Sequence, residues 1–141
     1  MKRATSPGAT LAVMVMATVA FAQSACANLD HLDLCQVEGD PSAQISAEGV
    51  RVRRGTAVAV QLIPYTSSDK VLEDHVDVTL QSKNPQVLDV APLAGSPGPS
   101  DCEAASDRAR YFVLWGNGAG ATELIVQVDG VEDRTIEAQV F

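Results

Sequence analysis

The sequence has few aromatic and few basic side chains. It contains three Phe, two Tyr and one Trp, and its ten Lys and Arg residues face eighteen Asp and Glu residues. A platform that stacks bases or sugars needs clustered aromatic side chains. Nucleic acid and anionic membrane surfaces attract proteins through a basic patch. The composition therefore argues against nucleic acid and against direct binding to an anionic membrane.

After residue 27, one cluster of three basic residues occurs within four positions. Arg51, Arg53 and Arg54 lie where an alternating segment gives way to Gly55. Alternation of apolar and polar residues indicates a half-buried strand, and the glycine indicates a turn. We interpret the three arginines as a strand end and turn that face water.

The residues that could carry out catalysis are also scarce. The two histidines, His31 and His75, each lie beside carboxylates, as expected of solvated residues in an acidic patch. No Gly-x-Ser-x-Gly elbow occurs, as a serine nucleophile would need. The glycine-rich run from Gly116 to Gly120 has no Lys-Ser or Lys-Thr after it, which makes it a β-turn rather than a phosphate loop. We predict no enzymatic activity and no cofactor.

Calcium is a separate question, because hard oxygen ligands are plentiful. Neither acidic segment has the spacing of an EF-hand, and calcium binding stays open. The carboxylates concerned are Asp69, Glu73 and Asp74 in one segment and Asp129, Glu132 and Asp133 in the other.

No apolar run is long enough to span a membrane. The longest, residues 11–22, falls short of the roughly 20 residues that a spanning helix needs. Lys2 and Arg3 precede it and small residues end it, which is the pattern of a cleavable signal peptide. We predict a signal helix within residues 1–27, and export to the periplasm, the cell envelope or the exterior.

The end of this signal leaves three cleavage positions open, after Ala22, after Ala25 or after Ala27. Cleavage after Ala25 would accompany lipidation of Cys26, because Ser24-Ala25-Cys26 is similar to the end of a bacterial lipobox. Gln23 stands where that pattern has an aliphatic residue. Contact with a membrane is expected only through such a lipid anchor.

Cysteine is rare as well. The chain has Cys26, Cys35 and Cys102. Removal or lipidation of Cys26 leaves the other two as a pair, whereas cleavage after Ala22 leaves a free thiol. Exported proteins meet an oxidising environment, and two lone cysteines without suitably spaced histidines do not make a zinc site. We expect a disulfide between Cys35 and Cys102.

Short alternating segments dominate the rest of the chain. Residues 75–81 alternate most cleanly, and Asp129-Gly130 between two valines indicates a two-residue hairpin. Pro64 is expected to end the strand that starts at Thr56. Residues 49–141 therefore predict about seven strands in an all-β, two-sheet antiparallel sandwich. The polar segment 28–48 is interpreted as a lead-in to this single domain.

The order of the breaks between strands resembles that of the bacterial Ig-like domains. The motifs are Ser82-Lys83-Asn84-Pro85-Gln86-Val87 and, later, Gly118-Ala119-Gly120-Ala121-Thr122 leading into Leu124-Ile125-Val126. The resemblance covers residues 49–141. It implies an Ig-like sandwich that acts as a scaffolding or binding module of surface proteins.

Three functions follow as hypotheses. The first is a non-enzymatic module that binds or spaces a protein or a cell-envelope polymer through its loops. The long loop of residues 92–107 is the candidate, with Ser96, Gly98, Ser100 and Asp101 as its binding residues. The second is an inhibitor of an exported protease that inserts the Gly116–Gly120 turn into a cleft. The third is a hydrolase that uses the acidic loops.

Overall fold

The computed structural model describes residues 28–95, 102 and 108–141. The predicted signal peptide with Cys26 lies outside the described residues. So do the candidate binding residues Ser96, Gly98, Ser100 and Asp101. Within the described ranges, no helix is long and apolar enough to cross a membrane.

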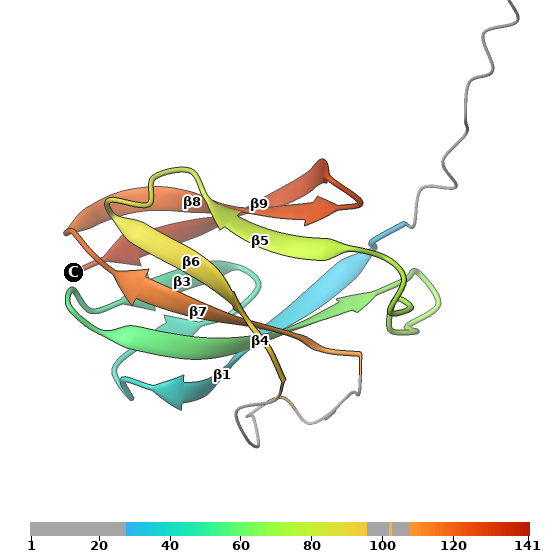
Figure 1. The fold of residues 1–141 in the computed structure, drawn as a ribbon, viewed down its shortest axis with the longest axis horizontal. Helices are drawn as coiled ribbons and strands as arrows, with labels where there is room; N and C mark the ends of the chain where they lie inside the picture. Colours follow the sequence, from blue (N-terminus) through green and yellow to red (C-terminus); the bar gives the residue numbers. More distant parts are fainter. Residues whose placement is uncertain (1–27, 96–101, 103–107) are drawn as a thin grey trace, which may run out of the picture.

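The described residues form nine strands in two sheets (Figure 1). One sheet has the order β1-β4-β7-β6, with bounds His31–Gly39, Ala57–Tyr65, Arg110–Gly116 and Leu88–Leu93. The other has the order β2-β3-β9-β8-β5, with bounds Gln44–Ile45, Gly49–Val52, Val131–Val140, Gly120–Val128 and Val78–Ser82. The predicted all-β, two-sheet architecture is confirmed; β3 to β9 lie within residues 49–141, and β1 and β2 lie in the segment 28–48.

Alternating side chains of both sheets meet in one core. Val58, Val60 and Leu62 of β4 are spaced two residues apart and point inward, and each is fully buried. The same period of two brings Leu114 of β7 and Leu124 of β8 into the core. Burial of a Leu or Val side chain contributes roughly 1.5–3 kcal/mol, so this layer is the main source of stability.

The segment interpreted as a lead-in belongs to the sandwich, which corrects the sequence analysis. β1 lies within residues 28–48 and pairs along β4 from His31↔Tyr65 to Gly39↔Val58. Leu29, Leu32 and Leu34 are buried in the core. Polar neighbours such as Asp33 hid this alternation, because they occupy the outer face of an edge strand.

Pro64 does not end its strand. β4 continues to Tyr65, and Pro64 pairs with Leu32 of β1. On the other side of β4, the pairing with β7 stops at Leu62↔Arg110, so no neighbouring strand requires an N–H from Pro64. Its carbonyl oxygen accepts a hydrogen bond from the backbone N–H of Leu72 at 2.9 Å.

One strand pair is parallel in a sandwich that was expected to be antiparallel. β3 runs alongside β9 from Gly49↔Glu137 to Val52↔Val140, whereas the other ladders between the described strands are antiparallel. The periodicity of β3 is the same for either direction. Only the path of the chain between the two sheets decides the direction of β3.

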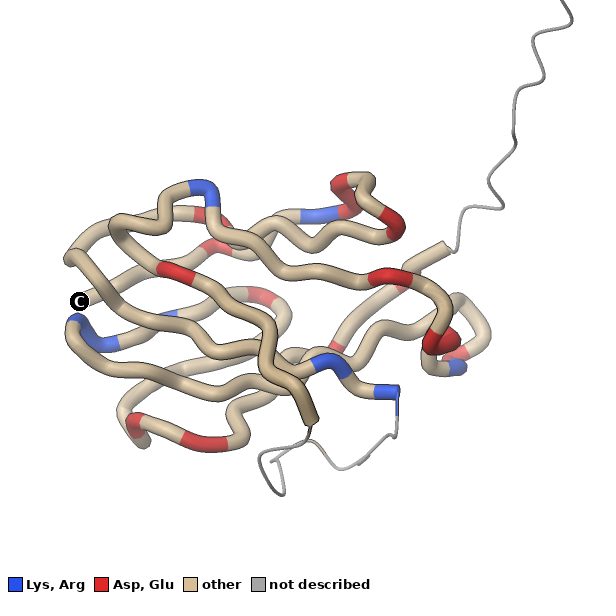
Figure 2. The backbone as a smooth tube through the Cα atoms, viewed as in Figure 1, with Lys and Arg blue, Asp and Glu red and all other residues tan. Residues whose placement is uncertain are grey.

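The predicted hairpin is confirmed at the junction of β8 and β9. Val128 pairs with Val131, and Asp129 and Gly130 both have positive φ angles, 51° and 78°. Two central residues of this kind match the right-handed twist of the strands. Figure 2 shows acidic residues at this hairpin, which lies at the same end of the sandwich as the 66–77 loop.

Candidate functional site

The outer face of the four-stranded sheet is mostly apolar where β4 begins, with Asp89 of β6 as an acidic neighbour of Trp115. Ala57 lies opposite Trp115, and Ala59 lies opposite Val113. Ala91 of β6 flanks Val113 on its other side. The Trp115 side chain is 38% exposed. We call these five residues the Trp115 face.

The outer face of the other sheet is different in character. Its neighbouring strands present polar side chains in rows, such as Arg51 beside Gln139 and Thr79 beside Gln127. Apolar side chains that cluster on a sheet face are a feature of interaction sites, because solvated sheet faces usually carry polar side chains.

The apolar composition of β7 is the sequence signal for this surface. Residues 111–115 are apolar on both faces of the strand. Phe112 and Leu114 are buried in the core. Val113 is only half-buried, and Trp115 is exposed. The inner side of β7 therefore lies in the core, and its outer side is open.

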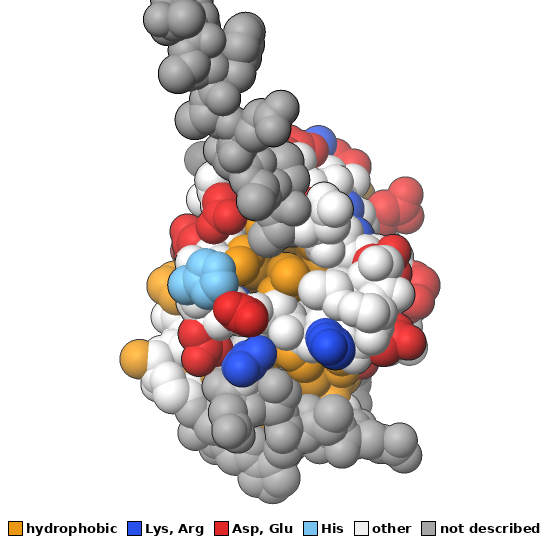
Figure 3. Space-filling model, turned by 90° about the vertical axis from the view of Figure 1, so that its right-hand side faces the viewer, with side chains coloured by type: hydrophobic (Ala, Val, Ile, Leu, Met, Phe, Trp, Pro, Cys, Tyr) orange, Lys and Arg blue, Asp and Glu red, His pale blue; other side chains and the backbone are white. Residues whose placement is uncertain are grey.

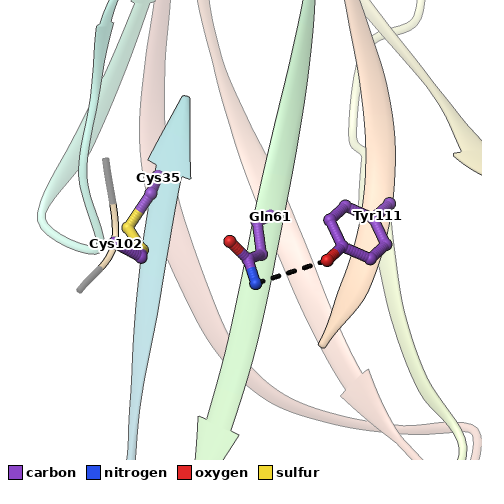
Figure 4. Close-up of a disulfide and its surroundings, with 4 residues drawn as sticks. All are labelled: Cys35, Gln61, Cys102 and Tyr111. Carbon is purple, nitrogen blue, oxygen red and sulfur yellow. Dashed lines mark hydrogen bonds between the residues drawn. A yellow bond between two sulfur atoms is a disulfide. The ribbon is translucent and has the colours of Figure 1, made fainter. Parts of the chain in front are cut away.

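The disulfide between Cys35 and Cys102 is present, with a Cα–Cα distance of 5.8 Å. Cys35, Gln61 and Tyr111 form one row across β1, β4 and β7 (Figure 4). The Gln61 amide donates a hydrogen bond to the Tyr111 hydroxyl at 3.5 Å, and its side chain is only 1% exposed. The disulfide thus fixes residue 102 beside the half of this sheet where Gln61 and Ile63 are buried.

His31 lies between two carboxylates at the acidic end of the molecule. Its Nδ1 atom is 2.9 Å from Asp30, and its Nε2 atom is 3.5 Å from Asp69. Its ring stacks on Tyr65 with a centroid separation of 4.8 Å. Figure 3 views this end and shows acidic side chains around a histidine. These contacts are solvent-exposed, and exposed pairs between charged or polar side chains contribute little to stability.

Burial and the surrounding negative charge both affect the pKa of Tyr65. Burial raises the pKa of its phenol, and the negative charge of Asp33 and a hydrogen bond to it raise the pKa further. Loss of the proton would add a negative charge beside Asp33 and Asp69. The phenol is therefore held neutral and is unsuited to act as a base near neutral pH.

Arg110 binds the 66–77 loop to β7. Its Nη2 atom donates hydrogen bonds to the carbonyl oxygens of Glu73 and Val76 at 3.0 and 2.9 Å. Partial burial lowers the pKa of the guanidinium, while Asp74 and Asp77 oppose that change. His75 in the same loop forms an exposed ion pair with Glu73 at 3.2 Å. The loop is therefore held by an arginine and carries its acidic residues outward.

Metal ligation was the open question for the acidic segments. In the part of the chain that the structure describes, no three His, Cys, Asp or Glu side chains come together as a metal site would need. The Asp129 carboxylate is engaged instead, because its Oδ1 atom accepts a hydrogen bond from the backbone N–H of Asp77 at 3.0 Å. This contact closes the hairpin onto β5.

The arginine cluster lies where its interpretation placed it, at the end of β3 and in the following turn. The Nε atom of Arg53 is 3.5 Å from a carboxylate oxygen of Asp40. The Arg51 guanidinium lies 5.1 Å above the centre of the Phe141 ring. Two of the three arginines, Arg51 and Arg53, therefore interact with side chains of the same chain.

A groove on the five-stranded sheet had no signal in the sequence. Its volume is about 1020 Å³, and its walls come from β2, β3, β8 and β9. Arg51, Glu123 and Glu137 supply charged groups along it. The residues come from segments far apart in the chain, so no local motif could have predicted the groove.

The Gly116–Gly120 link is packed against the 84–87 turn. The backbone N–H groups of Asn117 and Gly118 donate to the Val87 carbonyl at 2.9 and 3.1 Å. The Asn117 side chain donates to the Pro85 carbonyl at 2.9 Å. A Cβ atom on Gly118 would lie 2.9 Å from the Gln86 carbonyl oxygen, so a larger residue would push the turn away. These hydrogen bonds hold the Gly116–Gly120 link against the 84–87 turn, so the link does not project away from the domain.

Comparison with known proteins gives a likeness of fold. No family model and no curated protein matches the chain. Domains 5–6 of the S-layer protein SbsC superpose with a TM-score of 0.51 at 13% identity, over 75% of this chain and 45% of that one. Domains 4 and 5 of the same protein give 0.49 and 13% over 74% and 53%, and domains 4–9 give 0.49 and 14% over 81% and 14%. The chain spans about half the length of the two-domain structures, and identity this low indicates a shared fold only.

Proposed function

We propose that this chain is an exported, non-enzymatic Ig-like module that binds or spaces another macromolecule in the cell envelope or outside the cell. The strand order supports the Ig-like assignment. Ig domains have the order ABED in one sheet and CFG in the other. β1, β4, β7 and β6 take the places of A, B, E and D, and β5, β8 and β9 take those of C, F and G.

The disulfide and the structural likeness support the proposed location. Disulfides persist mainly in exported proteins, and the Cys35–Cys102 bond ties residue 102 to β1. The similar fold in SbsC belongs to an S-layer protein. The lipid anchor at Cys26 stays a prediction. Mass spectrometry of the mature N-terminus tests it, because an acylated Cys26 and a start at Asn28 exclude each other.

One observation carries the binding function. Trp115 projects from β7 beside the apolar side chains of Ala57, Ala59, Ala91 and Val113, and Asp89 of β6 lies opposite it on the same face. Tryptophan is among the residues that contribute most to binding energy in interfaces. The Trp115 side chain is 38% exposed, and we assign its exposed part to binding.

Co-sedimentation with isolated cell envelopes of the producing organism tests this function. We expect Trp115→Ala to lower the bound fraction several-fold. Val131→Ala is the matched control, because Val131 is 69% exposed and lies in the hairpin at the other end of the sandwich. Equal binding by both variants and the unmodified protein would refute the role of Trp115.

The two other functions have less support. The protease-inhibitor hypothesis needs a free turn at Gly116–Gly120, whereas the donors of Asn117 and Gly118 are already bonded to Val87. The hydrolase hypothesis relies on the carboxylates of the acidic loops as catalytic groups. His31 and His75 contact exposed carboxylates. Inhibition assays with exported proteases and an Asp74→Asn variant test them directly.

A further inference from the structure

The two sheets have edge strands β1, β6, β2 and β5. An edge strand exposes unpaired N–H and C=O groups that can pair with another strand, and natural proteins usually blunt such edges. Three of these edges are blunted. β2 contains only Gln44 and Ile45. β1 has a bulge between Gln36 and Glu38 and is joined to Cys102 at Cys35.

At the edge of β6, each backbone N–H that could face a new strand is either already hydrogen-bonded or absent. The Leu88 N–H donates to the Asn84 carbonyl at 3.1 Å. The Val90 N–H donates to the carboxylate of Asp89 at 2.9 Å. Pro92 has no N–H. β6 therefore offers no free donor along the side that faces away from β7.

β5 is not protected in this way. The Asp77 carbonyl accepts from the Asp129 N–H, and the Lys83 N–H donates to the Glu123 carbonyl. Hydrogen bonding alternates along an antiparallel pair, so Thr79 and Gln81 also bond toward β8. The N–H and C=O groups of Val78, Leu80 and Ser82 then point away from the sheet. No hydrogen bond engages these backbone groups within the described part of the chain.

We propose that two copies of this chain pair edge to edge through β5, antiparallel about Leu80. The hydrogen-bonding groups of Leu80 would then meet those of Leu80 in the second copy, and Val78 would meet Ser82. Each such pair exchanges two hydrogen bonds. The two five-stranded sheets would become one continuous sheet. The proposal does not depend on the proposed function.

The charges at the two ends of β5 point to a second copy as the occupant. Pairing centred on Leu80 places Asp77 opposite Lys83 of the partner subunit, and Lys83 opposite Asp77 of the partner subunit. Opposite charges stabilise directly opposed positions and like charges destabilise them. Thr79 would lie opposite Gln81 on the same polar face. The sequence of this edge is therefore complementary to itself.

The other contacts of these residues allow the pairing. Lys83 already binds Glu123 at 2.6 Å, and its side chain is about half exposed. In the dimer, the Lys83 ammonium group would lie between the carboxylates of Glu123 and the partner's Asp77, and it would form an ion pair with each. Val78 and Leu80 are only 4% exposed in the single chain, so dimerisation would bury little more of their side chains. Backbone hydrogen bonds and opposite charges would therefore supply most of the affinity.

Sedimentation over a range of concentrations provides the first test. We expect the protein to form a dimer, and Asp77→Lys to shift it to monomer because Lys would face Lys83. The double variant D77K/K83D restores opposite charges and should dimerise again. Glu48→Lys is the control, since it changes the charge equally in the exposed β2–β3 turn and should leave the dimer intact. A protein that is monomeric throughout, or a double variant that stays monomeric while folded, would overturn the proposal.

Cysteine cross-linking tests the register without charge changes. Thr79→Cys and Gln81→Cys are made as separate variants and oxidised alone or mixed. Side chains at such opposed positions lie about 4.5–5.5 Å apart at Cβ, close enough for a disulfide. We expect rapid cross-linking only in the mixture. Equal cross-linking in mixed and unmixed samples would exclude this register. Absence of cross-linked dimers of this chain in every sample would exclude self-pairing through β5.

Discussion

The guanidinium of Arg134 donates a hydrogen bond to the carbonyl oxygen of Leu29 at 3.2 Å, across 105 residues of sequence. The same Nη2 atom donates to the Asp30 carbonyl at 3.0 Å. Leu29 itself is buried in the core. The first described residues are therefore part of the folded domain, and a side chain of β9 holds them in place.

Replacement of Arg134 should loosen this end. We expect Arg134→Met to lower the free energy of unfolding by about 1.5–3 kcal/mol, the usual contribution of hydrogen bonds to a charged group. Amide hydrogen exchange should accelerate first in β1. Arg54→Met removes an exposed arginine in a turn and serves as the control. Unchanged exchange in β1 would show that the core alone holds Leu29.

The disulfide should stabilise the fold mainly through the unfolded chain. Its cysteines are 67 positions apart, and in the chain-entropy model a loop of that size contributes roughly 4 kcal/mol. The double variant C35S/C102S should unfold at a clearly lower denaturant concentration. Chemical reduction of the unmodified protein should give the same midpoint as the variant. A variant as stable as the oxidised protein would contradict this role.

Tyr65 should make stability depend on alkaline pH. Its pKa is raised in the folded state, from an ordinary value of 10.0, first by burial and then by Asp33. The folded state therefore keeps the proton longer than the unfolded state. The stabilising contribution is complete below the unfolded pKa and declines as pH rises through the folded pKa.

Denaturant unfolding at several pH values above about 10 measures this effect. We expect the stability of Tyr65→Phe to decline less steeply with pH than that of the unmodified protein, because phenylalanine does not titrate. Tyr111→Phe is the control that keeps Tyr65. Equal slopes for Tyr65→Phe and the unmodified protein would rule out the effect.

Local patterns predicted the individual strands well. Val58, Val60 and Leu62 are spaced two apart, and they are core residues because a strand places alternate side chains on one face. Asp129-Gly130 predicted its hairpin because those two residues tolerate the backbone angles that the turn requires. β1 was missed, since the alternation of Leu32 and Leu34 is short and lies among charged residues.

The candidate sites were less predictable than the strands. Both faces of β7 carry apolar side chains, yet Trp115 on the outer face is 38% exposed, so the apolar pattern did not distinguish the covered face from the open one. The open edge of β5 depends on which strands lie at the sheet margins. That order follows from pairings between segments distant in sequence, such as Leu80↔Val126.

The sequence by itself determined the two-residue period, the turns and the choice of cysteines, because each depends on neighbouring residues or on chemistry that any fold would share. Only the tertiary structure decided the parallel β3–β9 pair, the inclusion of residues 28–48 in the sandwich and the side of β7 that remains open. These features arise where strands far apart in the chain meet. The free energy of such contacts depends on the whole packing arrangement, which local periodicity does not encode.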